Sequence, residues 1–312
     1  MGIKNLNRFL LDNCSKKTIQ KTHLSILSNK KIVIDTSIYL YKFMGENSLM
    51  ESFYLFISIL LKYKISPIFI FDGKPPPEKK ELLIQRRIDK LEAREKYYEI
   101  KEKMETLTDE KKEEALHEME HLKKQFIRIK EEDIRKVKDL MDAYGIIWYD
   151  AEGESDMLCG YLTKQSDIWG CVSDDMDMFL YGCKRVVRHI SLLNHTVTVY
   201  DFQKILTDLQ MEEKLFREIM VISGTDYNIN KETSLYETIK WYYKYKEAGK
   251  NANFYEWLFQ NSSYVKNQEM LLKVYSMFLL HDDYHFDYTS KNTEKNMEKI
   301  KEIMEKEGFI FV

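Results

Sequence analysis

The chain alternates short runs of β-branched and aromatic residues with longer segments of helical periodicity, and this alternation constrains its fold more than any other feature. The short runs occupy residues 31–34, 67–71, 146–149, 169–172, 185–190 and 196–200. A strand, helix, strand repeat places successive strands in a parallel or mixed sheet that helices cover. The sequence therefore predicts an α/β protein with a central mixed, mostly parallel sheet flanked by helices.

Two segments depart from this alternation and predict additions to the sheet. Residues 78–143 are polar and contain few large apolar side chains before Leu122, so we expect a helical insertion that projects from the core. Residues 228–312 are rich in Tyr and Lys and have helical patterns, which predicts a helical C-terminal lobe. The sheet region is then divided between residues 1–77 and 144–227, within one integrated unit.

Composition excludes several classes of protein. The four cysteines form no C-x-x-C pair, which excludes a disulfide framework or zinc finger and predicts a reducing, intracellular setting. The longest apolar run is too short to cross a bilayer and no signal-peptide pattern is present, so we expect a soluble protein that is not secreted. The formal net charge of −3 argues against nucleic acid unless positive and negative side chains are separated on the surface.

Acidic residues follow the predicted strands where each strand ends. Four strands lead into such acids: Asp35, Asp72, the Glu154 and Asp156 pair, and the Asp175 and Asp177 pair. The carboxyl ends of strands form the ligand site of an open α/β sheet, so these acids would gather in one crevice. Crowded carboxylates repel unless cations lie among them. Oxygen ligands without nearby His or Cys favour Mg²⁺ or Mn²⁺ over zinc, and two such ions suit phosphodiester hydrolysis.

Acids that follow strands also have structural and other catalytic interpretations. A single Asp after a strand is more often a helix N-cap or a turn former than a metal ligand. The recurrence at four strand ends favours a metal site over that interpretation. A haloacid-dehalogenase-like phosphatase would need a second Asp two residues after Asp35, and Ser37 stands there.

Short motifs occur in order between residue 1 and about residue 230. They are Met1 to Leu6, Ile34 to Tyr41, Phe71 to Pro76, Glu154 to Met157, Asp174 to Asp177 and Gly224 to Tyr227. In these motifs the chain resembles the flap endonuclease family, the structure-specific 5′ nucleases related to XPG. The resemblance implies a PIN-like 5′ nuclease fold, in which residues 1–77 and 144–227 form the nuclease region. It also implies that residues 78–143 form a helical gateway and cap, and that residues 228–312 form a DNA-binding lobe.

The resemblance assigns roles to individual positions. It implies two Mg²⁺ ions, with Mn²⁺ able to substitute, held by or close to Asp35, Asp72, Glu154, Asp156, Asp175, Asp177 and Asp226. Lys79 and Arg86, two helical turns apart, would steady the scissile phosphate; without the resemblance they would be assigned to a solvated helix. Tyr41 would stack on the base beside the cut, although such a Tyr is usually partly buried core. Gly2 would lie near the site.

The gateway supplies further basic residues, and branched or flapped DNA is the partner that the resemblance implies. The additional DNA contacts would be Arg87, Lys123, Lys124, Arg128 and Lys130. The length of this segment favours flap or exonuclease-type substrates over Holliday junctions.

The chain departs from the family beyond Asp226. Residues 228–240 lack the glycine hairpin with which relatives grip duplex DNA beside a K⁺ ion, so a K⁺ site has no support in this sequence. Residues 308–312 do not form a recognisable sliding-clamp peptide. These differences favour a compact divergent or viral member, acting as a monomer at sites of DNA replication, in the nucleus or at a cytoplasmic viral replication site.

These inferences predict a Mg²⁺-dependent, structure-specific DNA endonuclease that cleaves 5′ flaps near the junction of single-stranded and double-stranded DNA, together with 5′–3′ exonuclease activity. It would serve replication, repair or recombination. One alternative is a recombination or double-strand-break repair nuclease that acts on other branched DNA. Another, outside the enzymes, is a catalytically silent DNA-structure-binding protein, and the presence of all seven acids argues against it.

Overall fold

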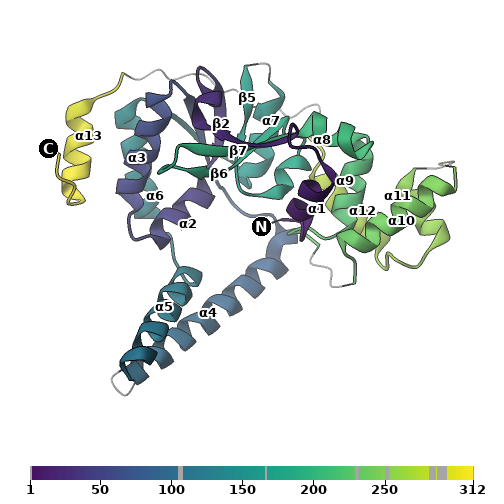
Figure 1. The fold of residues 1–312 in the computed structure, drawn as a ribbon, viewed down its shortest axis with the longest axis horizontal. Coiled ribbons are helices and arrows are strands. Elements are labelled where there is room, and N and C mark those ends of the chain that lie inside the picture. The colour runs from purple at the N-terminus through teal and green to yellow at the C-terminus, as the bar shows by residue number, and fades with distance from the viewer. Residues whose placement is uncertain are drawn as a thin grey trace.

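A central sheet organises the molecule (Figure 1). The computed structural model describes residues 2–104, 108–165, 167–228, 232–249, 253–280, 286 and 294–311. Across these residues the sheet has seven strands in the order β1-β7-β6-β5-β2-β3-β4. The strands are β1 (Ile19–His23), β2 (Lys31–Asp35), β3 (Ser66–Phe71), β4 (Ile147–Asp150), β5 (Ile168–Val172), β6 (Arg185–Ser191) and β7 (Thr196–Asp201).

The pairing of the strands confirms the predicted mixed, mostly parallel sheet. The ladders β4–β3, β3–β2, β2–β5 and β5–β6 are parallel, whereas β6–β7 and β7–β1 are antiparallel. All six predicted strands are present. The additional strand β1 was not predicted, because Ile19 is the only one of its five residues that is buried and its sequence has no apolar run.

Two layers of helices cover the two faces of the sheet. Within the central strand β2, Val33 packs into one core cluster while Ile32 and Ile34 pack into the other, as the alternation of a strand requires. The first cluster includes residues of α1 (Leu6–Asn13), α7 (Ser155–Lys164), α8 (Phe202–Leu209), α9 (Glu213–Ile222), α10 (Leu235–Glu247), α11 (Phe254–Asn261) and α12 (Gln268–Met277). The second includes residues of α2 (Thr36–Gly45), α3 (Leu49–Lys62), α6 (Glu131–Tyr144) and α13 (Met297–Lys306).

A helical hairpin extends away from the sheet (Figure 1). It consists of α4 (Lys80–Lys103) and α5 (Asp109–Gln125), which pack against each other. In α4 only Ala93 is buried, because the helix contacts little besides α5 along most of its length. Within residues 78–143, α4 and α5 therefore form the projecting part, which we call the arm, whereas α6 belongs to a layer that covers the sheet.

The C-terminal segment divides between the two faces of the sheet. Helices α10, α11 and α12 lie at one end of the molecule, while α13 lies at the other, beside α6 (Figure 1). Ile300 and Met304 of α13 are fully buried there, and Lys136 Nζ lies 2.8 Å from Glu307 Oε1. In the part of the chain that the structure describes, no helix has the length and apolar character needed to span a membrane.

Candidate active site

A cleft of about 390 Å³ lies at the carboxyl ends of the parallel strands. It contains six of the seven predicted acids, which come from β2, the segment after β3, the start of α7, the segment after β5 and the segment after α9. Lys79, Arg86 and Tyr41 also line it. The residues that meet there are Asp35, Asp72, Glu154, Asp156, Asp175 and Asp226. Parallel strands that end at the same edge of a sheet explain why residues so distant in sequence converge.

Hydrogen bonds hold Asp35 and Asp72 in place. The hydroxyls of Ser155 and Ser173 donate to Asp35, at 3.1 Å to Oδ1 and 2.9 Å to Oδ2. The backbone N–H of Ser155 donates to Asp72 Oδ1 at 2.8 Å, so the first turn of α7 joins the ends of β2 and β3. Asp35 is buried, whereas Asp72 is exposed at the edge of the cleft. No sequence pattern predicts a role for these two serines.

The seventh acid, Asp177, lies behind the cleft wall. It is buried, and its backbone N–H donates to Asp175 Oδ1 at 3.0 Å. A Cβ atom on Gly2 would come within 2.5 Å of one carboxylate oxygen of Asp175 and one of Asp177. Gly2 also has φ +78°, so only glycine fits there without strain. The structure thus places Gly2 against two of the predicted acids.

Lys79 and Arg86 form the basic side of the cleft. Lys79, in the turn that precedes α4, donates to Glu154 Oε1 and lies 3.7 Å from Asp226 Oδ2. Arg86 Nη2, on α4, donates to the same Asp226 oxygen at 2.8 Å. Both predicted bases therefore face the acids, although Lys79 lies in the turn before α4 and only Arg86 is on the helix itself.

Two buried tyrosines that do not line the cleft support Glu154. The hydroxyl of Tyr227 donates to Glu154 Oε2 at 2.7 Å, and the hydroxyl of Tyr181 lies 3.0 Å from that of Tyr227. Tyr227 is buried and stands next to Asp226 in the last of the sequence motifs. No role was predicted for Tyr227 from this motif. Its position directly after a predicted ligand was the available signal.

The cleft is electrostatically unfavourable when all its carboxylates are ionised. Burial is the largest cause and the charge of Asp72 the next that raise the pKa of Asp35, which reaches about 7. The hydrogen bonds from Ser173 and Ser155 lower this pKa but do not offset the increase. Burial is also the main cause that raises the pKa of Asp156, Asp175 and Asp177. These groups consequently favour either a proton or a nearby cation.

The two bases offset only part of this charge. Burial alone would lower the pKa of Lys79, but its hydrogen bond to Glu154 and the charges of Glu154 and Asp226 raise that pKa overall. Within the described ranges, no three His, Cys, Asp or Glu side chains lie close enough together to hold a metal ion as they stand. Lys79 contacts both Glu154 and Asp226, so its ammonium group already occupies the space between these two predicted ligands.

The remaining predicted DNA contacts lie outside the cleft or at its mouth. Tyr41 is half exposed, lines the cleft, and has Lys90 Nζ 5.2 Å from its ring centroid. The predicted basic contacts of the arm and its return segment are all exposed and line no part of the cleft: Arg87, Lys123, Lys124, Arg128 and Lys130. In the segment predicted to lack the duplex-binding hairpin, residues 229–231 lie outside the described residues.

The fold identifies the class of protein. The structure superposes on the catalytic core of Rad2, solved in complex with a DNA substrate, with a TM-score of 0.69. The superposition covers 99% of this chain and 95% of that one at 21% sequence identity. A sheet with this acid-lined edge and projecting arm is the 5′ nuclease fold.

Sequence comparison then identifies the family. Residues 1–93 match the XPG N-terminal domain and residues 145–226 match the XPG I-region. Flap endonuclease 1 of Methanococcus aeolicus is 31% identical over 235 residues, which cover 70% of this chain and 68% of the relative. A probable RAD2-like endonuclease of Invertebrate iridescent virus 6 is 28% identical over 282 residues, covering 74% and 68%. The chain belongs to the XPG family, which includes the flap endonucleases.

The chain is similar to only part of several of these relatives. It spans 62% of flap endonuclease 1 from Glycine max and 52% of that from Cryptosporidium muris.

Proposed function

We propose that this protein is a Mg²⁺-dependent, structure-specific DNA nuclease that cleaves 5′ flaps near the junction of single-stranded and double-stranded DNA, and that it also removes nucleotides from 5′ ends. The observation that carries the proposal is the cleft itself. Six acids from five separate segments meet there, opposite Lys79 and Arg86. Acids that can hold divalent cations, opposite two bases that can contact a phosphate directly, suit the hydrolysis of a phosphodiester.

The residues of the cleft fit divalent cations. All the candidate ligands are carboxylate oxygens, which Mg²⁺ and Mn²⁺ prefer. Asp177 Oδ1 is buried and lacks a hydrogen-bond partner among the described residues, so a cation nearby would satisfy it. We propose that the seven acids hold two such ions, directly or as close supports. When bound, the ions supply an activated water and stabilise the charge on the leaving oxygen.

The side chains of the cleft have distinct tasks in this proposal. Lys79 and Arg86 hold the scissile phosphate and offset the charge that develops on it, while their contacts with Glu154 and Asp226 fix their orientation. Ser155 and Ser173 keep the carboxylate of Asp35 pointing into the cleft. Tyr41 at the mouth stacks on the base next to the cleaved bond.

The arm supplies the path for the single strand. Its exposed bases would contact phosphates and make binding strongly salt-dependent, because each neutralised phosphate releases counterions. We propose that the protein acts as a monomer on branched DNA that arises in replication, repair or recombination.

A cleavage assay tests the proposal. The protein is incubated with 5′-labelled flap, gapped, nicked, blunt and four-way-junction DNA, with Mg²⁺, with Mn²⁺ or with EDTA. We expect flap cleavage that requires the divalent ion and is lost in Asp175→Ala and Asp177→Ala. Asp12→Ala, which removes an exposed acid of α1 outside the cleft, is the matched control and should cleave normally.

Two outcomes would contradict the proposal in different ways. Binding of flap DNA without Mg²⁺-dependent cleavage would favour a silent DNA-structure-binding protein. A strong preference for four-way junctions or blunt ends would favour a recombination or double-strand-break nuclease.

A further inference from the structure

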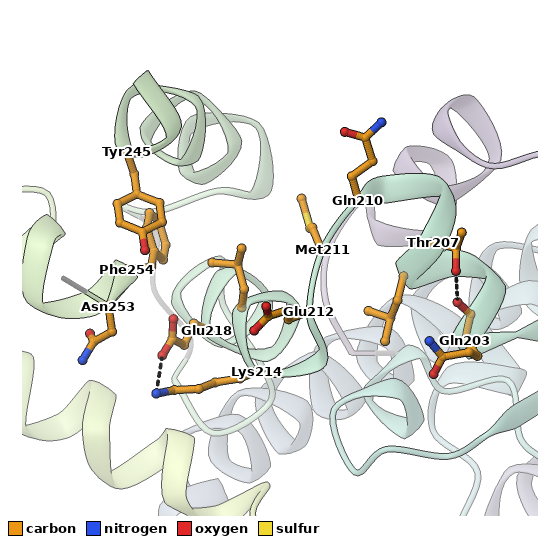
Figure 2. Close-up of a pocket in the computed structure, with 12 residues that line it drawn as sticks. Gln203, Thr207, Gln210, Met211, Glu212, Lys214, Glu218, Tyr245, Asn253 and Phe254 are labelled. Carbon is orange, nitrogen blue, oxygen red and sulfur yellow. Dashed lines mark hydrogen bonds and ion pairs between the residues drawn. The ribbon is translucent and has the colours of Figure 1, made fainter. Parts of the chain in front are cut away.

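A second cavity lies away from the acidic cleft. It has a volume of about 580 Å³ and is enclosed by α8, α9, the loop between them, and the facing parts of α10 and α11 (Figure 2). No residue lines both this cavity and the cleft. Its size is typical of a ligand site, and nothing in the proposed nuclease reaction uses it.

A buried carboxylate faces this cavity. Glu218, on α9, is 5% exposed and lines the cavity wall (Figure 2). No described residue donates a hydrogen bond to its carboxylate, and the nearest cation, Lys214 Nζ, lies 4.0 Å from Oε1. The side chain of Lys214 is 65% exposed, so this ion pair is loose. The carboxylate oxygens of Glu218 are not among the fully buried, unpartnered atoms of the described residues, so they face the open cavity, where a cation from outside can reach them.

The other walls suit a cationic side chain with an apolar stem. Tyr245 and Phe254 pack with ring centroids 5.4 Å apart and planes at 61°, and both line the cavity close to Glu218 (Figure 2). Met211 and Leu206 add buried apolar surface. Aromatic rings attract cations through their faces, and aliphatic surface accommodates the methylenes of Lys or Arg.

The rim of the cavity is polar and exposed. Gln203, Thr207, Gln210 and Glu212 surround the opening, and all four are exposed to solvent. An apolar centre with a polar rim is the usual anatomy of a protein-binding site, where backbone groups of the partner meet the rim. The two acids in the cavity, Glu212 and Glu218, outnumber the single base, Lys214.

We propose that this cavity binds a lysine or arginine side chain of a partner protein, with the cationic group on Glu218 and the alkyl chain against Met211 and Phe254. Lys214 is the intramolecular substitute for that group and moves into solvent when the partner binds. Burial raises the pKa of Glu218 to about 7, while Lys214 lowers it and Glu256 raises it. An added cation would favour the ionised carboxylate that burial disfavours.

Calorimetric titration of the 312-residue protein with short peptides tests this site. The probe is the amidated peptide acetyl-Ala-Leu-Lys-Leu-Ala, and the matched control peptide carries norleucine, which is neutral, in place of lysine. At pH 7.5 we expect the lysine peptide to bind about tenfold more tightly, as for a desolvated charge pair. Glu218→Gln should remove this preference, Lys214→Met should strengthen lysine-peptide binding, and the exposed-site control Glu247→Gln should change neither.

Several results would overturn the proposal. Equal binding of the two peptides, or a preference that survives in Glu218→Gln, would exclude Glu218 as the cation site. Spermidine that binds through Glu218 at least as tightly as the peptide would identify a small polyamine as the occupant instead of a protein. If Glu218→Gln does not fold, two measurements still test the proposal. They are the comparison of the lysine and norleucine peptides on the wild type, and the change in lysine-peptide binding in Lys214→Met. Flap cleavage is measured separately, so this site and the proposed nuclease function can fail independently.

Discussion

Replacing Asp35 with Asn should stabilise the metal-free protein at high pH, because Asp35 is a buried carboxyl among other acids. Asn has the same shape and can still accept the hydroxyl of Ser155. Its amide N–H₂ would donate to Ser173, whose hydroxyl now donates to Asp35 Oδ2. The substitution therefore removes the charge while conserving the contacts.

The magnitude follows from the pKa of Asp35. Its ordinary value is 3.8 and its value in the folded protein is about 7, so the folded state binds the proton more tightly than the unfolded state. The stability that this gives is fully present below pH 3.8 and is lost as the pH rises through about 7. A difference of about three units between the folded and unfolded pKa corresponds to a loss of roughly 4 kcal/mol of folding stability at pH 8. Asp35→Asn has no carboxyl group to ionise at this position, so it does not lose this stability.

Urea unfolding in EDTA at pH 4.5 and pH 8 measures the effect. We expect Asp35→Asn to gain about 3 kcal/mol over wild type between the two pH values, because about 1 kcal/mol of the effect is already lost at pH 4.5, with the exposed-site control Asp12→Asn gaining little. A cation that binds the folded state raises its stability. Mg²⁺ should therefore stabilise the wild type more at pH 8, where the carboxylates are ionised, than at pH 4.5. It should stabilise Asp35→Asn less than the wild type, because the variant lacks one carboxylate. Parallel pH dependence in wild type and variant would refute the reasoning.

Three further substitutions probe the cleft. Gly2→Ala forces a Cβ atom against Asp175 and Asp177 at a positive φ. It should therefore lower the melting temperature and raise the Mg²⁺ concentration needed for half-maximal cleavage. Unchanged values of both would contradict the observed packing of Gly2. Lys79→Met should lower kcat about 10²- to 10³-fold, whereas Lys80→Met, one residue on and exposed, should leave it near wild type; equal losses would point to general charge rather than position. Tyr41→Ala should raise KM for flap DNA about 10-fold or more while Tyr41→Phe keeps it, and a loss in both would exclude stacking.

The position of the six acids that follow strands was predictable from the sequence because two local rules were sufficient, whereas Asp226, which follows α9, was assigned only by the family resemblance. Short β-branched runs identify strands, and the carboxyl ends of parallel strands share one edge. Asp35 and Asp72 therefore had to approach each other once β2 and β3 were paired, and the register confirms that these strands are neighbours. The strand β1 escaped prediction because an edge strand with one buried residue has no apolar signature.

The serines and tyrosines around the cleft could not be predicted in the same way. Ser155 and Ser173 reach the same carboxylate of Asp35 from two different segments, and the buried Tyr227 donates to Glu154 from the segment after α9. None of these contacts follows from a spacing in the chain. They depend on the angle at which α7 and the segment after α9 approach the sheet.

The sequence by itself determined the order of strands and helices, the residues at the strand ends and the family, because these follow from local periodicity and from motifs that are contiguous in the chain. Only the tertiary structure decided that Gly2 packs against Asp175 and Asp177, that α13 returns to pack on α6, and that Glu218 faces a cavity. Such features arise from packing between distant segments. Burial and charge at a point in space are set by every element that meets there, and no single segment of sequence encodes them.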